Sequence, residues 1–228
     1  MALIRLGPRA AAKQRRLATL RAERSVDEAF LATCVGDARL LGSLELAGIR
    51  VSWSELRSGA APVEAQRLRA AARVVPSDAP LDRTALRAWH GAVVGVPSAW
   101  RGEPRGRAGA APVERIEGRL EILEAWLAGD SVARLKPAEA GSLVLSRIVE
   151  ILPFDDGNGR VSRLAAGHAM LRAGGQAPIL VGADAARLQE CLRAAFALEL
   201  EPLSTLLEEA SERALDVEIQ VLEGRVQG

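Results

Sequence analysis

Residues 155–160, with the sequence DDGNGR, combine residue types that can hold a phosphate group. Gly157 and Gly159 can adopt positive φ, and Asn158 tolerates it better than most residues. A turn of this kind aims successive backbone N–H groups into one concavity, which suits an anion. A helix that begins near Arg160 adds its positive N-terminal end. The spacing therefore predicts a site for a di- or triphosphate.

Three charged side chains flank this turn. Arg160 can bind phosphate oxygens with both arms of its guanidinium group, and Arg163, about one helical turn further, faces roughly the same way. Asp156 can hold a Mg²⁺ ion that bridges those oxygens. The expected cofactor is therefore Mg²⁺ together with ATP or another nucleotide. The alternative is an ordinary corner between two helices, in which the aspartate only caps the second helix.

The longer segment LPFDDGNGRVSR, residues 152–163, resembles the signature of the Fic family, which is His-Pro-Phe-x-(Asp/Glu)-Gly-Asn-Gly-Arg-x-x-Arg. Every fixed position matches except the first, where Leu152 replaces the histidine. The segments LRAWHGAVVG (86–95), SAWRG (98–102) and VERIEGRLEILEAWL (113–127) also resemble parts of that family. The resemblance covers about residues 80–210.

The resemblance implies transfer of AMP from ATP to a hydroxyl group of a protein. Asp156 would then bind Mg²⁺, the turn 157–159 would hold the phosphates, and Arg160 and Arg163 would neutralise their charge. Phe154 would point into the core and anchor the loop.

The family resemblance also implies a short β-hairpin flap within about residues 102–112, with Arg101 and Gly102 at its start. This flap would hold a segment of the protein target by strand-like pairing. The expected partners are therefore the nucleotide and a protein that docks at the flap.

Leu152 occupies the position of the family's histidine, which takes the proton from the attacking hydroxyl. Leucine cannot accept a proton, and losing a positioned general base typically removes a factor of about 10²–10⁴ in rate. The phosphate-binding groups remain, so we expect nucleotide binding with lost or much reduced AMP transfer. The alternative is an active transferase with altered chemistry or donor, transferring a nucleotide or sugar-nucleotide group to a protein hydroxyl, with Asp155 or a substrate phosphate as the base.

The segment SLELAG, residues 43–48, resembles the inhibitory helix of many Fic proteins, whose pattern is Ser/Thr-x-x-x-Glu-Gly/Asn. Ser43 and the final glycine match, but Ala47 stands at the glutamate position. Glu45 lies on the wrong face of a helix to replace that glutamate. The family's inhibitory glutamate pairs with the second arginine of the motif, so we expect Arg163 to lack its inhibitor. The alternative is that this segment is an ordinary helix end.

Composition and periodicity predict an all-α helical bundle. Aromatic residues make up only 3% of the chain, and the apolar residues recur with helical spacing. We expect an N-terminal helical region (1–78) that includes the inhibitory-like segment, a Fic-like core (79–215) and a C-terminal tail (216–228). Residues 1–24 are basic and are expected to be mobile. Helices are expected at about residues 26–46, 63–75, 82–94, 113–127, 137–152, 161–173, 184–200 and 202–215.

The net charge, the length of the apolar stretches and the cysteine content limit the classes of protein to which this chain can belong. The formal net charge is +1, which gives no reason to expect binding to nucleic acid or to an anionic membrane. No stretch is long and apolar enough to span a membrane, and the N-terminus lacks the continuous apolar core of a secretory signal. Cys34 and Cys191 are expected to be buried thiols, although one disulfide is conceivable. We therefore expect a cytoplasmic protein, with a homodimer left open.

Overall fold

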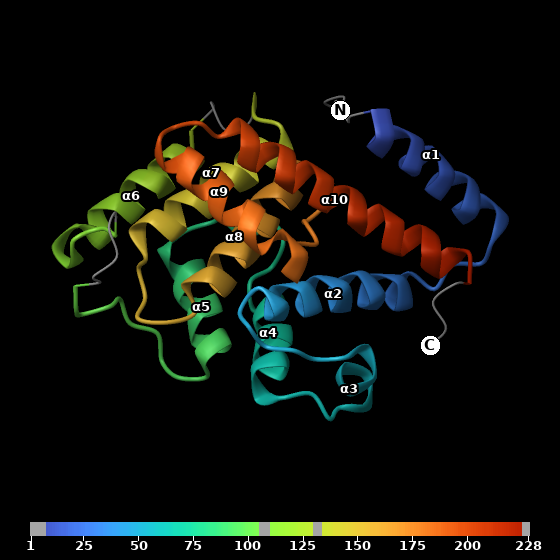
Figure 1. The fold of residues 1–228 in the computed structure, drawn as a ribbon, viewed down its shortest axis with the longest axis horizontal. Coiled ribbons are helices and arrows are strands. Elements are labelled where there is room, and N and C mark those ends of the chain that lie inside the picture. The colour runs from blue at the N-terminus through green and yellow to red at the C-terminus, as the bar shows by residue number, and fades with distance from the viewer. Residues whose placement is uncertain (1–7, 105–109, 130–133, 225–228) are drawn as a thin grey trace.

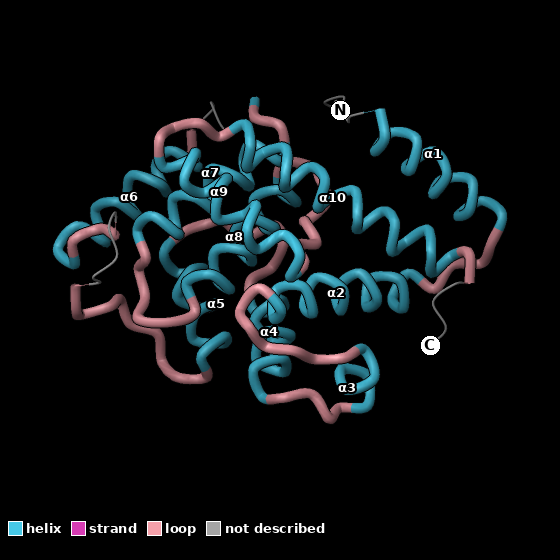
Figure 2. The backbone as a smooth tube through the Cα atoms, in the orientation of Figure 1, coloured by secondary structure: helices cyan, strands magenta, loops and turns pink. Residues whose placement is uncertain are grey.

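The structure is a computed structural model that describes residues 8–104, 110–129 and 134–224, and the regular elements of these residues are all helical (Figures 1 and 2). The all-α class is therefore confirmed. In chain order the elements are α1 (Pro8–Glu23), α2 (Glu28–Glu45), α3 (Trp53–Ser58), α4 (Val63–Val74), α5 (Arg83–Val94), the short 3-10 turn η1 (Val113–Arg115), α6 (Ile116–Leu127), α7 (Pro137–Ile151), α8 (Asn158–Arg172), the 3-10 turn η3 (Gly182–Asp184), α9 (Ala185–Phe196) and α10 (Glu201–Leu222).

Helices α7 and α8 make the most extensive helix–helix contact and form the centre of the fold (Figure 1). Within α7, Val144, Leu145 and Ile148 are at most 1% exposed. The apolar cluster around Val144 and Ile148 includes Leu44 of α2 and Leu68 of α4 as well as residues of α5, α6 and α8. The N-terminal helices and the Fic-like segment therefore share one core, because burial of their apolar faces is the main favourable term in packing them.

The close approach of α2 to the segment around Leu180 depends on a glycine. A Cβ atom built on Gly42 would lie 1.9 Å from the carbonyl oxygen of Leu180. Further along α2, the Oε2 atom of Glu45 accepts a hydrogen bond of 2.9 Å from the backbone N–H of Gly182. These two contacts fix the C-terminal end of α2 against the rest of the fold.

The N-terminal segment differs from the expectation, because residues 8–23 form helix α1 instead of a mobile segment. Figure 1 shows α1 beside the C-terminal half of α10. Leu17 and Leu20 are buried there together with Leu215 and Leu222. Helix α10 continues to Leu222, across residue 216, where the tail was expected to begin.

The β-hairpin flap expected within residues 102–112 is not seen. Residues 98–104 and 110–112 form no strand, and residues 105–109 lie outside the described residues. Pro104 and Pro112 each remove a backbone donor from this segment. The backbone groups at residues 101, 103 and 111 are instead hydrogen-bonded to the loop after α7 or to the Arg101 side chain.

Two further expectations can be compared with the described residues. Cys34 and Cys191 are both free and buried, as expected. None of the described helices has both the length and the apolar character needed to cross a membrane.

Candidate functional site

The loop that joins α7 to α8, residues 152–157, carries most of the predicted site, and we call it the motif loop. It begins at Leu152, which ends α7 in the left-handed conformation with φ 48° and ψ 63°. This conformation costs roughly 1–2 kcal/mol for a residue with a Cβ atom, and histidine adopts it several times more often than most residues do. The backbone at this position therefore suits the family's histidine better than it suits leucine.

The amide side chain of Asn158 holds the motif loop closed. Its Oδ1 atom accepts a hydrogen bond from the backbone N–H of Phe154 at 3.0 Å, and its Nδ2 atom donates to the carbonyl of the same residue at 2.7 Å. The Phe154 ring is fully buried, as expected, and stacks on His90 with a centroid distance of 3.9 Å. Asn158 thus shapes the loop through its side chain.

Arg101 ties the segment after α5 to the motif loop. Its side chain is only 1% exposed, and its Nε atom donates to the carbonyl of Leu152 at 2.6 Å. The other two guanidinium nitrogens donate to the carbonyls of Glu103 and Ala111, while its backbone N–H donates to the carbonyl of Pro153 at 2.9 Å. The Arg101 side chain therefore faces inward, and it cannot itself contact a docked protein in this conformation.

Gly157 starts α8 in the left-handed conformation, with φ 72°. A Cβ atom at this position would lie 3.4 Å from methyl groups of Val93 and Val94, which is ordinary contact. The backbone conformation, and not the space, therefore requires glycine here. The first backbone N–H groups of α8 have no partner within the helix, so they are available to an anion at the turn.

The motif loop borders a hollow of about 610 Å³, which we call the motif hollow. The structure brings the predicted phosphate-binding, metal-binding and base positions together around it, along with the degenerate inhibitory position Ala47. Ser43, Arg101 and Gly102 do not line it. Its wall consists of Leu152, Asp155, Asp156, Gly157, Asn158, Gly159, Arg160 and Arg163, with Leu46, Ala47, Ile49 and Glu64 from the N-terminal helices.

Two guanidinium groups and the three carboxylates of Glu64, Asp155 and Asp156 line the motif hollow. Arg160 is 12% exposed, and its Nη2 atom lies 3.1 Å from a carboxylate oxygen of Asp156, whose side chain is 83% exposed. Arg163 donates from Nε to the Ser43 hydroxyl at 2.9 Å and from Nη2 to the Ser43 carbonyl at 2.8 Å. Burial and the nearby Arg160 charge lower the pKa of Arg163 to about 10, which leaves it charged at neutral pH.

The segment that resembles an inhibitory helix borders the motif hollow. Ala47 lines the motif hollow, and Ser43 holds Arg163 in place. Glu45 points instead to the backbone of Gly182. Among the described residues, no carboxylate forms an ion pair with Arg163.

Glu64, at the start of α4, lines the motif hollow but has no sequence signal, because it lies about 90 residues before the motif.

The two histidines of the chain are packed within the fold. His90 forms a hydrogen bond of 2.9 Å with Ser98 through Nδ1, and burial lowers its pKa despite a backbone hydrogen bond with Asp156 that raises it. His168 bonds to the Ala79 carbonyl at 2.9 Å. Both side chains are buried.

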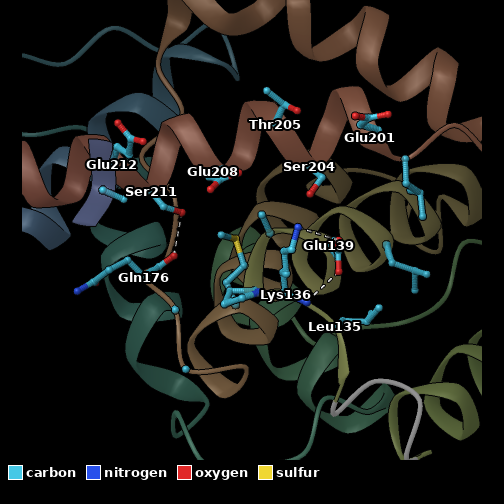
Figure 3. A pocket seen from close by; sticks show the side chains of 18 of the residues that line it. Leu135, Lys136, Glu139, Gln176, Glu201, Ser204, Thr205, Glu208, Ser211 and Glu212 are labelled. Carbon is cyan, nitrogen blue, oxygen red and sulfur yellow. Dashed lines mark hydrogen bonds and ion pairs between the residues drawn. The ribbon is translucent and has the colours of Figure 1, made fainter. Parts of the chain in front are cut away.

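A separate cavity of about 660 Å³ lies between α7, α10 and α1 (Figure 3). None of the predicted site residues lines it. Acidic residues along α10, labelled in Figure 3, face this cavity, and the Lys136 and Glu139 side chains on its other wall lie 3.8 Å apart. Its acidic lining is unsuited to a polyphosphate.

Comparisons with known proteins agree with the geometry of the motif loop. Residues 80–170 match the model of the Fic/DOC family. A curated relative, "Protein adenylyltransferase Fic" of Drosophila erecta, is 29% identical over 98 residues, which are 43% of this chain and 20% of the relative. The chain thus spans about a fifth of the length of that relative.

Solved structures share the fold at low sequence identity. A Fic-domain-containing signaling protein from Bacteroides thetaiotaomicron has a TM-score of 0.79 at 16% identity, covering 96% of this chain and all of the other. IbpAFic2 in complex with adenylylated Cdc42 has a TM-score of 0.57 at 17% identity, covering 89% of this chain and 70% of the other. From the motif, its geometry and these matches, residues 80–170 form a domain of the Fic/DOC family.

Proposed function

We propose that this chain binds a nucleotide at the motif hollow and has lost, or retains little of, the AMP transfer of its adenylyltransferase relatives. The observation that carries the proposal is the composition of the hollow's wall. Arg160, Arg163 and the free N–H groups at the start of α8 supply sites for phosphate. Leu152 supplies only hydrocarbon at the position of the base.

Mg²⁺ fits this site as a companion of the nucleotide. Mg²⁺ usually binds through one or two carboxylates together with substrate phosphates and water, not in a cage made only of protein groups. Asp156 offers one well-exposed carboxylate beside Arg160. A bound Mg²⁺ would offset the negative charge of the phosphate oxygens. Asp156 would hold it, and Arg160 would then be freed to face the phosphates.

A protein partner follows from the comparisons more than from the described residues. The curated relative is named a protein adenylyltransferase, and one similar structure contains adenylylated Cdc42. We propose that a protein segment docks near residues 102–104 of this chain. Because the Arg101 side chain is buried, this contact would not use it.

A second candidate function is a transferase with altered chemistry, and one observation favours it. Asp155 and Glu64 line the same hollow as Leu152, and Glu64 forms no ion pair or side-chain hydrogen bond within the described part of the chain. A carboxylate that reaches the attacking hydroxyl can act as a general base. In this case the reaction would proceed without histidine.

Calorimetry and intact-mass measurements test these proposals together. We expect the native chain to bind ATP in the presence of Mg²⁺, and we expect Leu152→His to gain auto-modification by about 10²–10⁴-fold. Leu152→Asn is the matched control, because asparagine also tolerates the left-handed conformation but is not a base.

Three outcomes separate the alternatives. The absence of nucleotide uptake by the native chain would overturn the proposal. Transfer by the native chain that disappears in Glu64→Gln would favour the second function. A Leu152→His variant that binds ATP but stays unmodified would show that more than the base is missing.

A further inference from the structure

A cavity of about 310 Å³ lies between α2, α4 and residues 178–180, and we call it the α2–α4 cavity. It is distinct from the motif hollow, but Arg163 lines both. Its volume is at the lower end of the range for small-molecule pockets. Much of its wall is aliphatic, with Leu40, Leu68, Leu164, Pro178 and Leu180 among the lining residues.

The cavity wall also contains a partly buried cation that lacks a counter-ion. The Nη2 atom of Arg39 donates to the Ala177 carbonyl at 3.3 Å. The Nε atom of Arg39 is buried and has no hydrogen-bond partner. Within the described residues, Arg39 forms no ion pair with a carboxylate, and burial lowers its pKa. A cation that loses part of its hydration without gaining a carboxylate is unfavourable, so an anion bound beside it would stabilise it.

The acidic residue in the cavity wall does not satisfy this need. Asp37 is buried, and its carboxylate lies 2.7 Å from Nη2 of Arg69. That pair neutralises itself. Arg39, Arg73 and Arg163 are left as cations without a carboxylate partner among the described residues, and all three line the same small cavity.

We propose that the α2–α4 cavity binds a small amphipathic carboxylate. The carboxylate would accept hydrogen bonds from the guanidinium group of Arg39, and the apolar body would lie against Leu40, Leu68 and Leu180. The aliphatic side chains of the wall favour a carboxylate with an apolar body over inorganic phosphate, which has no apolar surface to bury.

The shared wall at Arg163 links this ligand to the nucleotide, a step that rests on the proposed function above. Both anions draw on the charge of Arg163, so each weakens binding of the other. Such coupling is reciprocal, and typical values change affinity by about 5–150-fold. The carboxylate would thus act as a negative regulator of nucleotide binding.

Thermal unfolding without nucleotide tests the site by itself. Hexanoate and phenylacetate serve as carboxylate probes, hexanamide as the uncharged control and inorganic phosphate as the competing anion. We expect the carboxylates to raise the Tm of the native chain, with little or no shift from hexanamide or phosphate. A shift with phosphate alone, or no shift with any carboxylate, would overturn the proposal.

Two variants locate the effect. Arg39→Met should unfold at an equal or higher temperature than the native chain, because it removes a partly buried charge that has no carboxylate partner, and it should lose the carboxylate shift. Arg193→Met, which changes an exposed arginine on α9, is the matched control and should keep the shift. An unchanged hexanoate shift in Arg39→Met would refute the role of Arg39.

The third variant tests the cavity without touching its charges. Gly36 lines the cavity, and a Cβ atom built there would meet no heavy atom within 4 Å. Gly36→Leu should therefore fold, fill the cavity and abolish the shift.

Finally, saturating hexanoate should weaken ATP binding by about 5-fold or more in the native chain and not in Arg39→Met. Failure of ATP binding without hexanoate would count against the proposed function only, since the thermal shifts need no nucleotide.

Discussion

Replacing Arg101 with methionine should destabilise the chain by about 3–5 kcal/mol. The guanidinium group of Arg101 donates to the carbonyls of Leu152, Glu103 and Ala111. The Ala111 carbonyl is buried, and leaving it without a donor costs about 1–3 kcal/mol, while the bonds to the part-buried carbonyls of Leu152 and Glu103 have a charged donor and contribute about 1.5–3 kcal/mol each. Removing a buried charge recovers part of that cost, because its own desolvation is relieved. The net loss in the free energy of unfolding is therefore expected in the lower part of the range obtained by adding the costs for the three carbonyls.

Urea unfolding of three variants measures this effect. Arg101→Lys keeps the charge, but one ammonium group cannot span three separate carbonyls, so its loss should be intermediate. Arg119→Met is the matched control, because Arg119 is 37% exposed and its ion pair with Glu150 is long, at 3.8 Å. It should change stability by no more than about 0.5 kcal/mol. ATP affinity should fall in Arg101→Met even where the chain stays folded, since the motif loop loses its tie at Leu152.

The result that refutes this reasoning is a small change. A loss below about 1 kcal/mol with unchanged ATP affinity would mean that Arg101 does not hold the motif loop. If such a stable variant also failed to capture a protein target, Arg101 would act in docking, as the sequence had indicated.

Two further changes test the packing and the titration of the fold. Gly42→Ala should lower the free energy of unfolding by about 2–3 kcal/mol, because its Cβ would lie 1.9 Å from the Leu180 carbonyl oxygen and the backbone must move. Gly36→Ala on the same helix is the control, and it should raise the free energy of unfolding by about 0.5–1 kcal/mol. Equal urea midpoints for the two variants would contradict the observed contact. Burial lowers the pKa of both His90 and His168 below the ordinary value of 6.5, so the folded state binds protons less readily than the unfolded state. Their contribution to stability is present above pH 6.5 and is lost as the pH falls through the lower folded values. The free energy of unfolding should therefore fall between pH 7.5 and 5.5, and a variant with glutamine at both positions should lose much of this dependence. An identical pH profile for that variant would exclude the histidines as its cause.

The central helices could be predicted from sequence because their apolar spacing is strong. The apolar run of α7 and the turn 157–159 placed the centre of the fold and the motif loop to within a few residues. Helix α1 was missed because its few leucines lie among many basic residues, and its apolar face is completed only by α10. Helix α1 is stabilised by packing against α10, and the local sequence pattern does not show this contact.

The candidate site was predictable where its residues are contiguous and not where the fold assembles them. The motif residues and Ala47 meet at one hollow, as expected. Glu64 and Arg39 could not be found from spacing, since their positions depend on how α4 and α2 pack against α8. The inward direction of Arg101 was equally hidden, because only the fold shows that the Leu152, Glu103 and Ala111 carbonyls surround it.

The hydrogen bonds that Asn158 and Arg101 make to the motif loop have a consequence for the evolution of the site. Both side chains shape the motif loop from within, through backbone groups of Phe154 and Leu152. The motif loop is thus held in one conformation before a ligand binds, so little conformational entropy is lost on binding. Because these hydrogen bonds use the backbone of the loop, the side chain at residue 152 can change while they are kept, provided that the new residue adopts the left-handed conformation.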